Sequence, residues 1–148
     1  MAARGMLTNL ALGAFVISLT VAIHTLGLIA VTHAMGRLTS RVRLRGRRSR
    51  ILAMVITVMG IFGIITVEVW LWAAWHYALG VIPTFEDALY FSTVTFSTLG
   101  YGDVLPVHEW RLFASLEAAN GFLLIGWSTA YLVAAGMRVG PFRSGEHF

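Results

Sequence analysis

The six residues 98–103, Thr-Leu-Gly-Tyr-Gly-Asp, have types and a spacing that suit a binding site for a bare cation. Glycine occurs at every second position, Gly100 and Gly102, and it reaches backbone conformations with positive φ that other residues avoid. The chain can then run extended with successive carbonyl groups on one side. Four such segments around an axis would form stacked rings of oxygen that replace the water around a dehydrated cation. The Thr98 hydroxyl would add one more ring at the inner end.

This hexapeptide resembles the signature filter of the pore-loop potassium channel superfamily, and within it the small bacterial two-pore-domain-like ion channels. The resemblance covers about residues 51–138, and Leu99 stands where the common filter has valine. It implies a homotetramer, because one chain supplies only one strand of the filter. It further implies no organic cofactor, and a filter of five residues of which the first four bind K⁺: Thr98, Leu99, Gly100, Tyr101 and Gly102.

The composition is that of a membrane protein. Of the 148 residues, 57% are hydrophobic and only 12% are charged, whereas a soluble domain carries about a quarter. There is room for about three membrane spans, and the absence of cysteine excludes disulfides and thiolate metal sites. No nucleic-acid partner is expected, because most of the basic charge lies in one short loop. The five histidines are scattered, and no nucleophile–base pair or phosphate loop is present, so an enzyme is not expected either.

Three long apolar segments predict an all-α membrane protein with three transmembrane helices: residues 9–34, 51–78 and 112–137. A signal peptide is the alternative for the first segment, but its apolar core would be shorter. His24 and Glu68 are interpreted as buried hydrogen-bonding residues, with a proton relay as the alternative for His24. Gly60 and Gly63 offer a close-packing face for a neighbouring helix.

The segment 36–50 sets the expected orientation. It holds seven arginines in fifteen residues, and no acidic residue occurs before Glu68. Short arginine-rich loops stay cytoplasmic, which would place the N-terminus outside and the C-terminus inside a bacterial inner membrane. Residues 37–50 could also bind anionic lipid headgroups. A voltage sensor is not expected, because these arginines lie outside both spans.

A short helix is expected before the filter. Residues 80–83 break the second span, Thr84 is a candidate N-cap with Asp87 three residues later, and the helix carries residues 88–97. It is too short to span a bilayer and is therefore predicted to be re-entrant. The Tyr90 hydroxyl could hydrogen-bond Asp103 behind the filter. Some family members have a glutamate where this chain has Val94, so that carboxyl pair is absent.

The last span should line the pore. Gly121 lies where the family has a hinge glycine, and close packing is the alternative role. Four residues at helical spacing would then face the cavity: Phe122, Ile125, Thr129 and Val133. Glu117 is expected to support the filter, with Thr93, Thr95 and Ser97 as candidate partners, or else to be a passive packing contact. Asn120 could turn toward the cavity or toward a helix interface.

The predicted organisation has four parts: an N-terminal transmembrane helix (1–35), a cytoplasmic loop (36–50), a pore module of outer helix, pore helix, filter and inner helix (51–138), and a short tail (139–148). The predicted function is passive, potassium-selective conduction through a homotetrameric pore in the lipid bilayer. The alternatives are a weakly selective cation channel and a non-conducting membrane subunit of the same fold.

Overall fold

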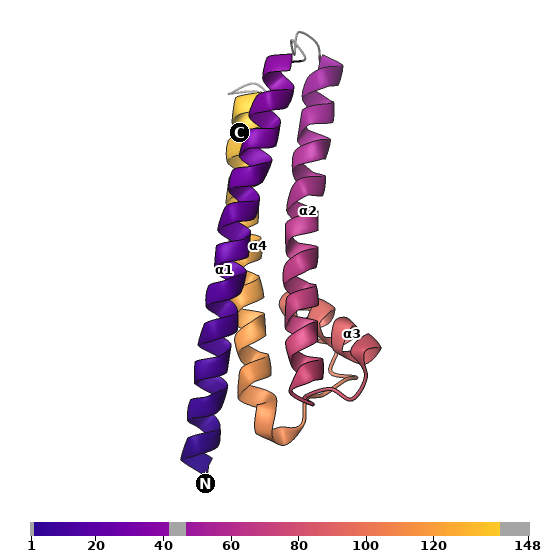
Figure 1. The fold of residues 1–148 in the computed structure, drawn as a ribbon. Helices are drawn as coiled ribbons and strands as arrows, with labels where there is room; N and C mark the ends of the chain where they lie inside the picture. The colour runs from indigo at the N-terminus through magenta and orange to yellow at the C-terminus, as the bar shows by residue number, and fades with distance from the viewer. Residues whose placement is uncertain (1, 42–46, 140–148) are drawn as a thin grey trace.

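The computed structural model describes residues 2–41 and 47–139, and the regular elements in those ranges are all helical. Three long helices lie side by side: α1 (Ala2–Arg41), α2 (Arg47–Ala78) and α4 (Arg111–Val139) (Figure 1). The short helix α3 (Phe85–Phe96) packs at one end of this bundle, and the 3-10 turn η1 (His108–Trp110) leads into α4. The expected fold of three long helices and one short helix is confirmed.

Each long helix contains a segment that is long and apolar enough to cross a membrane: Gly5–Arg37, Ser49–Ala78 and His108–Arg138. By contrast, the 12 residues of α3 extend only about 18 Å, which is too short for a ~30 Å hydrocarbon core. Both flanking helices continue into the segment expected to be a loop. Within that segment α1 continues to Arg41 and α2 begins at Arg47, whereas residues 42–46 fall outside the described residues, as does the tail from residue 140.

The connection between α2 and α3 is short, and its middle residues are buried. Gly80 has a φ of 66°, and the following amides of Val81 and Ile82 donate to the carbonyl of His76 at 2.9 and 3.4 Å. The side chains of Val81 and Ile82 are buried in the core. Thr84 then caps α3 by accepting a hydrogen bond from the amide of Asp87 at 3.1 Å, as the sequence predicted. The turn therefore fixes where α3 begins.

Small residues let α1 approach the other two long helices closely. Gly60 of α2 faces Val31, where a Cβ would lie 2.9 Å from a methyl carbon, and Gly13 of α1 packs directly on Leu116 of α4. Such contacts hold membrane helices together by van der Waals packing. A Cβ at Gly63 would meet nothing within 4 Å among the described residues of one chain, so close packing at Gly63 stays a prediction.

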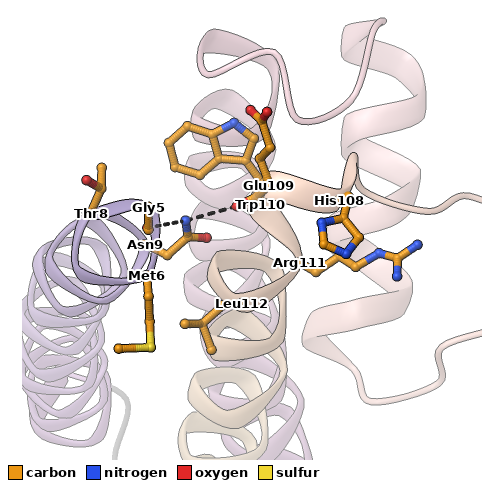
Figure 2. Close-up of a pocket in the computed structure, with 9 residues that line it drawn as sticks. All are labelled: Gly5, Met6, Thr8, Asn9, His108, Glu109, Trp110, Arg111 and Leu112. Carbon is orange, nitrogen blue, oxygen red and sulfur yellow. Dashed lines mark hydrogen bonds between the residues drawn. The ribbon is translucent and has the colours of Figure 1, made fainter. Parts of the chain in front are cut away.

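Asn9 of α1 caps the beginning of α4. Its side-chain oxygen accepts a hydrogen bond from the amide of Phe113 at 2.9 Å, and its amide donates to the carbonyl of Glu109 at 3.0 Å. Figure 2 shows this side chain beside a cleft of about 640 Å³ between the two helix starts. The first backbone amides of a helix have no acceptor within that helix, and an N-cap side chain usually provides one. Here the acceptor comes from Asn9 on a different helix, α1.

The closest approach of α4 to α3 is at Gly121. A Cβ at this position would overlap the backbone carbonyl of Phe96, the last residue of α3. Gly121 is also buried. Of the two expected roles, the structure supports close packing, since no side chain fits between the two backbones here.

We predict that Gly121→Ala destabilises the protein by about 2 kcal/mol, because the new methyl group must push α3 and α4 apart. Gly126→Ala is the matched control. It lies on the same helix, meets nothing within 4 Å in the described part of the chain, and should be neutral or slightly stabilising. Thermal unfolding in detergent micelles measures both. Equal midpoints for the two variants would contradict the assignment of Gly121 as a packing residue.

Candidate ion-conduction site

Residues 97–103 leave the C-terminal end of α3 and remain attached to its last turn. The amide of Thr98 donates to the carbonyl of Thr95 at 2.9 Å, and the amide of Gly100 reaches back to the carbonyl of Val94 at 2.9 Å. The first half of the candidate filter is therefore fixed relative to the helix. The partial negative charge at the C-terminus of α3 lies at the same place, where it favours a cation.

The backbone of the candidate filter alternates in handedness. Thr98, Gly100 and Gly102 have φ values of 61°, 53° and 77°, whereas Leu99 and Tyr101 between them do not have positive φ. Such alternation is the backbone pattern that a one-sided row of carbonyl groups needs. The two glycines adopt it without steric cost, but a β-branched residue does not. The positive φ of Thr98 is therefore a local strain that the sequence did not reveal, of a kind that persists at functional sites when the surroundings enforce it.

The candidate filter is exposed on one side of the single chain. Tyr101 has 68% of its surface accessible, and Leu99 is also largely exposed. A binding site for a dehydrated cation must surround it with oxygen, and one strand cannot do so. One chain alone therefore does not enclose a cation at this segment.

Tyr90 and Asp103 join α3 to the end of the candidate filter, as the sequence predicted. The Tyr90 hydroxyl donates a hydrogen bond to Asp103 Oδ2 at 2.7 Å, and Asp103 Oδ1 accepts one from the amide of Val104 at 3.1 Å. The bond from Tyr90 lowers the pKa of Asp103 and raises that of Tyr90. The contact ties the Asp103 end of the candidate filter to α3, and its role in keeping the filter open stays a prediction.

The hydrogen bond that Glu117 makes is not with Thr93, Thr95 or Ser97, its three expected partners. Its carboxyl group lies 2.7 Å from Nε2 of His76, and both side chains are fully inaccessible. The hydroxyls of Thr93 and Ser97 instead donate to carbonyls of their own helix. The His76 ring meets Phe91 of α3 edge-on, with ring centroids 5.1 Å apart. The pair therefore connects α2 to α4 directly behind the pore helix.

A second pair of the same kind lies farther from α3. Nδ1 of His24 in α1 is 2.9 Å from the carboxyl group of Glu68 in α2, and both are fully buried. This confirms both as buried hydrogen-bonding residues. The histidines looked scattered in the sequence because the partners are separated by 44 and 41 positions. The signal in the sequence was the presence of Glu68 and Glu117 within otherwise apolar segments, where a carboxyl group needs a partner.

The predicted cavity residues all lie on α4. Phe122 is 73% accessible, Thr129 and Val133 are exposed, and Ile125 is half-buried against the core. Asn120 turns toward the helix interface rather than the cavity, because its amide donates to the Thr20 hydroxyl of α1 at 2.9 Å. Whether the four residues line a cavity depends on the assembled pore.

Three helices of spanning length, a short helix among them and a loop of alternating handedness at its C-terminus define a membrane pore module. Residues 63–138, just over half of the chain, match the family model described as ion channel, and the chain belongs to this ion channel family. It is thus a multi-pass membrane protein and not an enzyme. The matched range contains α3, the candidate filter and α4, whereas α1 lies outside it. No curated protein and no solved structure matches the chain.

We predict that Tyr90→Phe removes a contribution to the free energy of unfolding that the wild type itself loses in acid. The bond to Tyr90 favours the ionised form of Asp103, so its contribution is full above the ordinary pKa of an aspartate, near 3.8. It is lost as the pH falls through the lowered pKa of the folded state. The unfolding midpoints of wild type and Tyr90→Phe should therefore differ at neutral pH and converge in acid. Tyr77→Phe is the control, because that ring packs against Phe85 instead. A constant difference at every pH would contradict the assignment.

We also predict that His76 and Glu117 act as a unit. Removing one partner of a buried pair leaves an uncompensated polar group, so Glu117→Leu should lower the free energy of unfolding by about 3 kcal/mol. The double variant His76→Phe/Glu117→Leu should lose less than the sum of the two single variants. Additive losses in a double-mutant cycle would show that the two groups do not interact.

Proposed function

We propose that this protein is a potassium-selective channel that conducts K⁺ passively through a homotetrameric pore. The filter consists of residues 98–102, with K⁺ held at Thr98, Leu99, Gly100 and Tyr101. The observation that carries the proposal is the alternating sign of φ through this segment at the C-terminus of α3. A backbone with this alternation can supply a row of oxygens to an ion on an axis.

The chemistry is an exchange of ligands around the ion. K⁺ gives up its hydration water and gains carbonyl oxygens at little net cost, and neighbouring ions repel each other onward. Since the ligands are backbone atoms, leucine at position 99 keeps them and changes only the packing behind the filter. The inward-facing ends of four pore helices would add a favourable potential for a cation.

Exposed apolar surface around the filter supports the tetramer. Tyr101 and Leu99 are both largely accessible in one chain. Side chains of this kind beside a polar conduction path need covering by protein, because the path itself is wet. Cyclic symmetry brings the same surface of each subunit to the axis.

The arrangement of the helices agrees with the proposed orientation. The start of α1 and the α3–α4 connection lie at one end of the bundle, and the ends of α1 and α4 lie at the other (Figure 1). Arginine-rich loops stay in the cytoplasm, so the filter would open to the outside and the cavity residues of α4 would face inward. Binding of anionic lipid at residues 37–50 is part of this proposal, although most of those side chains lie outside the described residues.

The proposal predicts that Gly100→Ala and Gly102→Ala abolish K⁺ flux into liposomes, because alanine is strained at their positive φ and would turn the carbonyls. Gly80→Ala is the matched control. Gly80 has a similar φ of 66° but lies in the α2–α3 turn, so the variant should lose stability and keep its selectivity.

Each other outcome of the flux assay is informative. Potassium flux of normal size through either filter variant would contradict the filter assignment. Equal flux of Na⁺ and K⁺ through the wild type would support a weakly selective cation channel. A stable tetramer without flux would support a non-conducting subunit.

A further inference from the structure

We infer that α1 positions the selectivity filter: through the hydrogen bond between Thr20 and Asn120 it holds α4 against the last turn of the pore helix. This inference rests on the proposed potassium-channel function. It concerns a helix that lies outside the range matched by the ion channel family, so the family assignment says nothing about it.

The first helix runs parallel to α4 and makes polar contacts with it at several levels. Both helices begin at the filter end of the bundle (Figure 1). In order along α1, the contacts are Asn9 to the amide of Phe113 at 2.9 Å, Thr20 to Asn120 at 2.9 Å, His24 to Ser128 at 3.4 Å and Thr32 to Tyr131 at 2.8 Å. Contacts spread along the whole helix make α1 and α4 move together rather than slide past each other.

Two of these side-chain contacts are enclosed, Thr20–Asn120 and His24–Ser128, and the first is the shorter, at 2.9 Å against 3.4 Å. Thr20 is fully inaccessible and Asn120 nearly so. The Thr20 hydroxyl accepts from the Asn120 amide, and it lies 2.9 Å from the carbonyl of Ile17, to which it donates. Its donor and acceptor roles are both used, and no water in the membrane interior would replace the bond.

This bond is next to the contact between α4 and the pore helix. Asn120 precedes Gly121, whose Cα is seated on the carbonyl of Phe96. Phe96 ends α3, and the strained Thr98 follows two residues later. The backbone of α4 is therefore clamped between α1 on one side and the start of the filter on the other.

The helix α1 is itself held in place by contacts with α2. His24, one turn after Thr20 on α1, is paired with Glu68 of α2 at 2.9 Å, and Gly27 of α1 packs on Ile64 of the same helix. Because α2 anchors α1, the bond from Thr20 can hold α4 in place. A positive φ at a threonine persists only while its surroundings enforce it. Loosening α4 at Gly121 therefore relaxes the start of the filter.

The test compares two identical changes on α1. Thr20→Val and Thr32→Val each remove a hydroxyl that bonds α4 and keep the side-chain shape, but Thr32 lies well beyond the level of Phe96. Two quantities are measured for each: the K⁺/Na⁺ flux ratio in liposomes, and the difference in thermal midpoint between K⁺ and Na⁺ solutions. If Thr20 only stabilises the fold, its loss lowers the thermal midpoints in K⁺ and in Na⁺ by the same amount. The difference between the two midpoints and the flux ratio then stay unchanged.

We expect Thr20→Val to lower the K⁺/Na⁺ flux ratio about threefold or more, because each subunit loses one interhelical hydrogen bond. The difference in thermal midpoint between K⁺ and Na⁺ solutions should also become smaller. Thr32→Val should change neither, and Thr20→Ser, which keeps the hydroxyl, should behave as wild type. Asn120→Ala removes the donor of the same hydrogen bond. It replaces Thr20→Val in the test if that variant does not fold.

Two results would overturn the inference: an unchanged flux ratio in both Thr20→Val and Asn120→Ala, or an equal loss in Thr32→Val. A wild-type protein without potassium selectivity would instead contradict the proposed function. The two failures are therefore distinguishable.

Discussion

The backbone of α4 touches the last carbonyl of α3 at Gly121, and the other elements are arranged around that contact. It fixes where the pore helix ends, and so where the candidate filter begins. The turn at residues 80–83, with Val81 and Ile82 buried in the core, sets the other end of α3. A helix fixed at both ends can support a loop with a strained residue, Thr98, at its first position.

Hydrogen bonds between buried polar groups fix the positions of the helices relative to one another. Between apolar helices in lipid the hydrophobic effect gives no preference for one partner over another, so packing and hydrogen bonds decide. The two histidine–glutamate pairs, the Asn9 cap and the Thr20–Asn120 bond each join different helices. Each pair gives a buried polar group its partner, and a charge left without a partner in this interior would be costly.

Local signals in the sequence predicted the elements well. Apolar length predicted the three long helices, and Thr84 and Asp87 predicted the start of α3. The hydrogen bond between Tyr90 and Asp103 was expected from the resemblance to the potassium channel family. Contacts between distant helices were not predictable in the same way. His76 and Glu117 are 41 positions apart, and nothing local distinguishes His76 from the other histidines. The choice between hinge and packing at Gly121 likewise depended on which backbone lies opposite, a property of the tertiary arrangement alone.

The central claim is that chains meet on an axis with main-chain oxygens of residues 98–102 directed at the ion. A density map of the purified protein in a membrane mimetic, with thallium in place of potassium, tests it most directly. The account predicts four chains around one axis and a row of heavy-ion peaks along it, level with Thr98 to Gly102. Monomers or dimers in the bilayer, or carbonyl groups turned away from the axis with no ion between them, would contradict it.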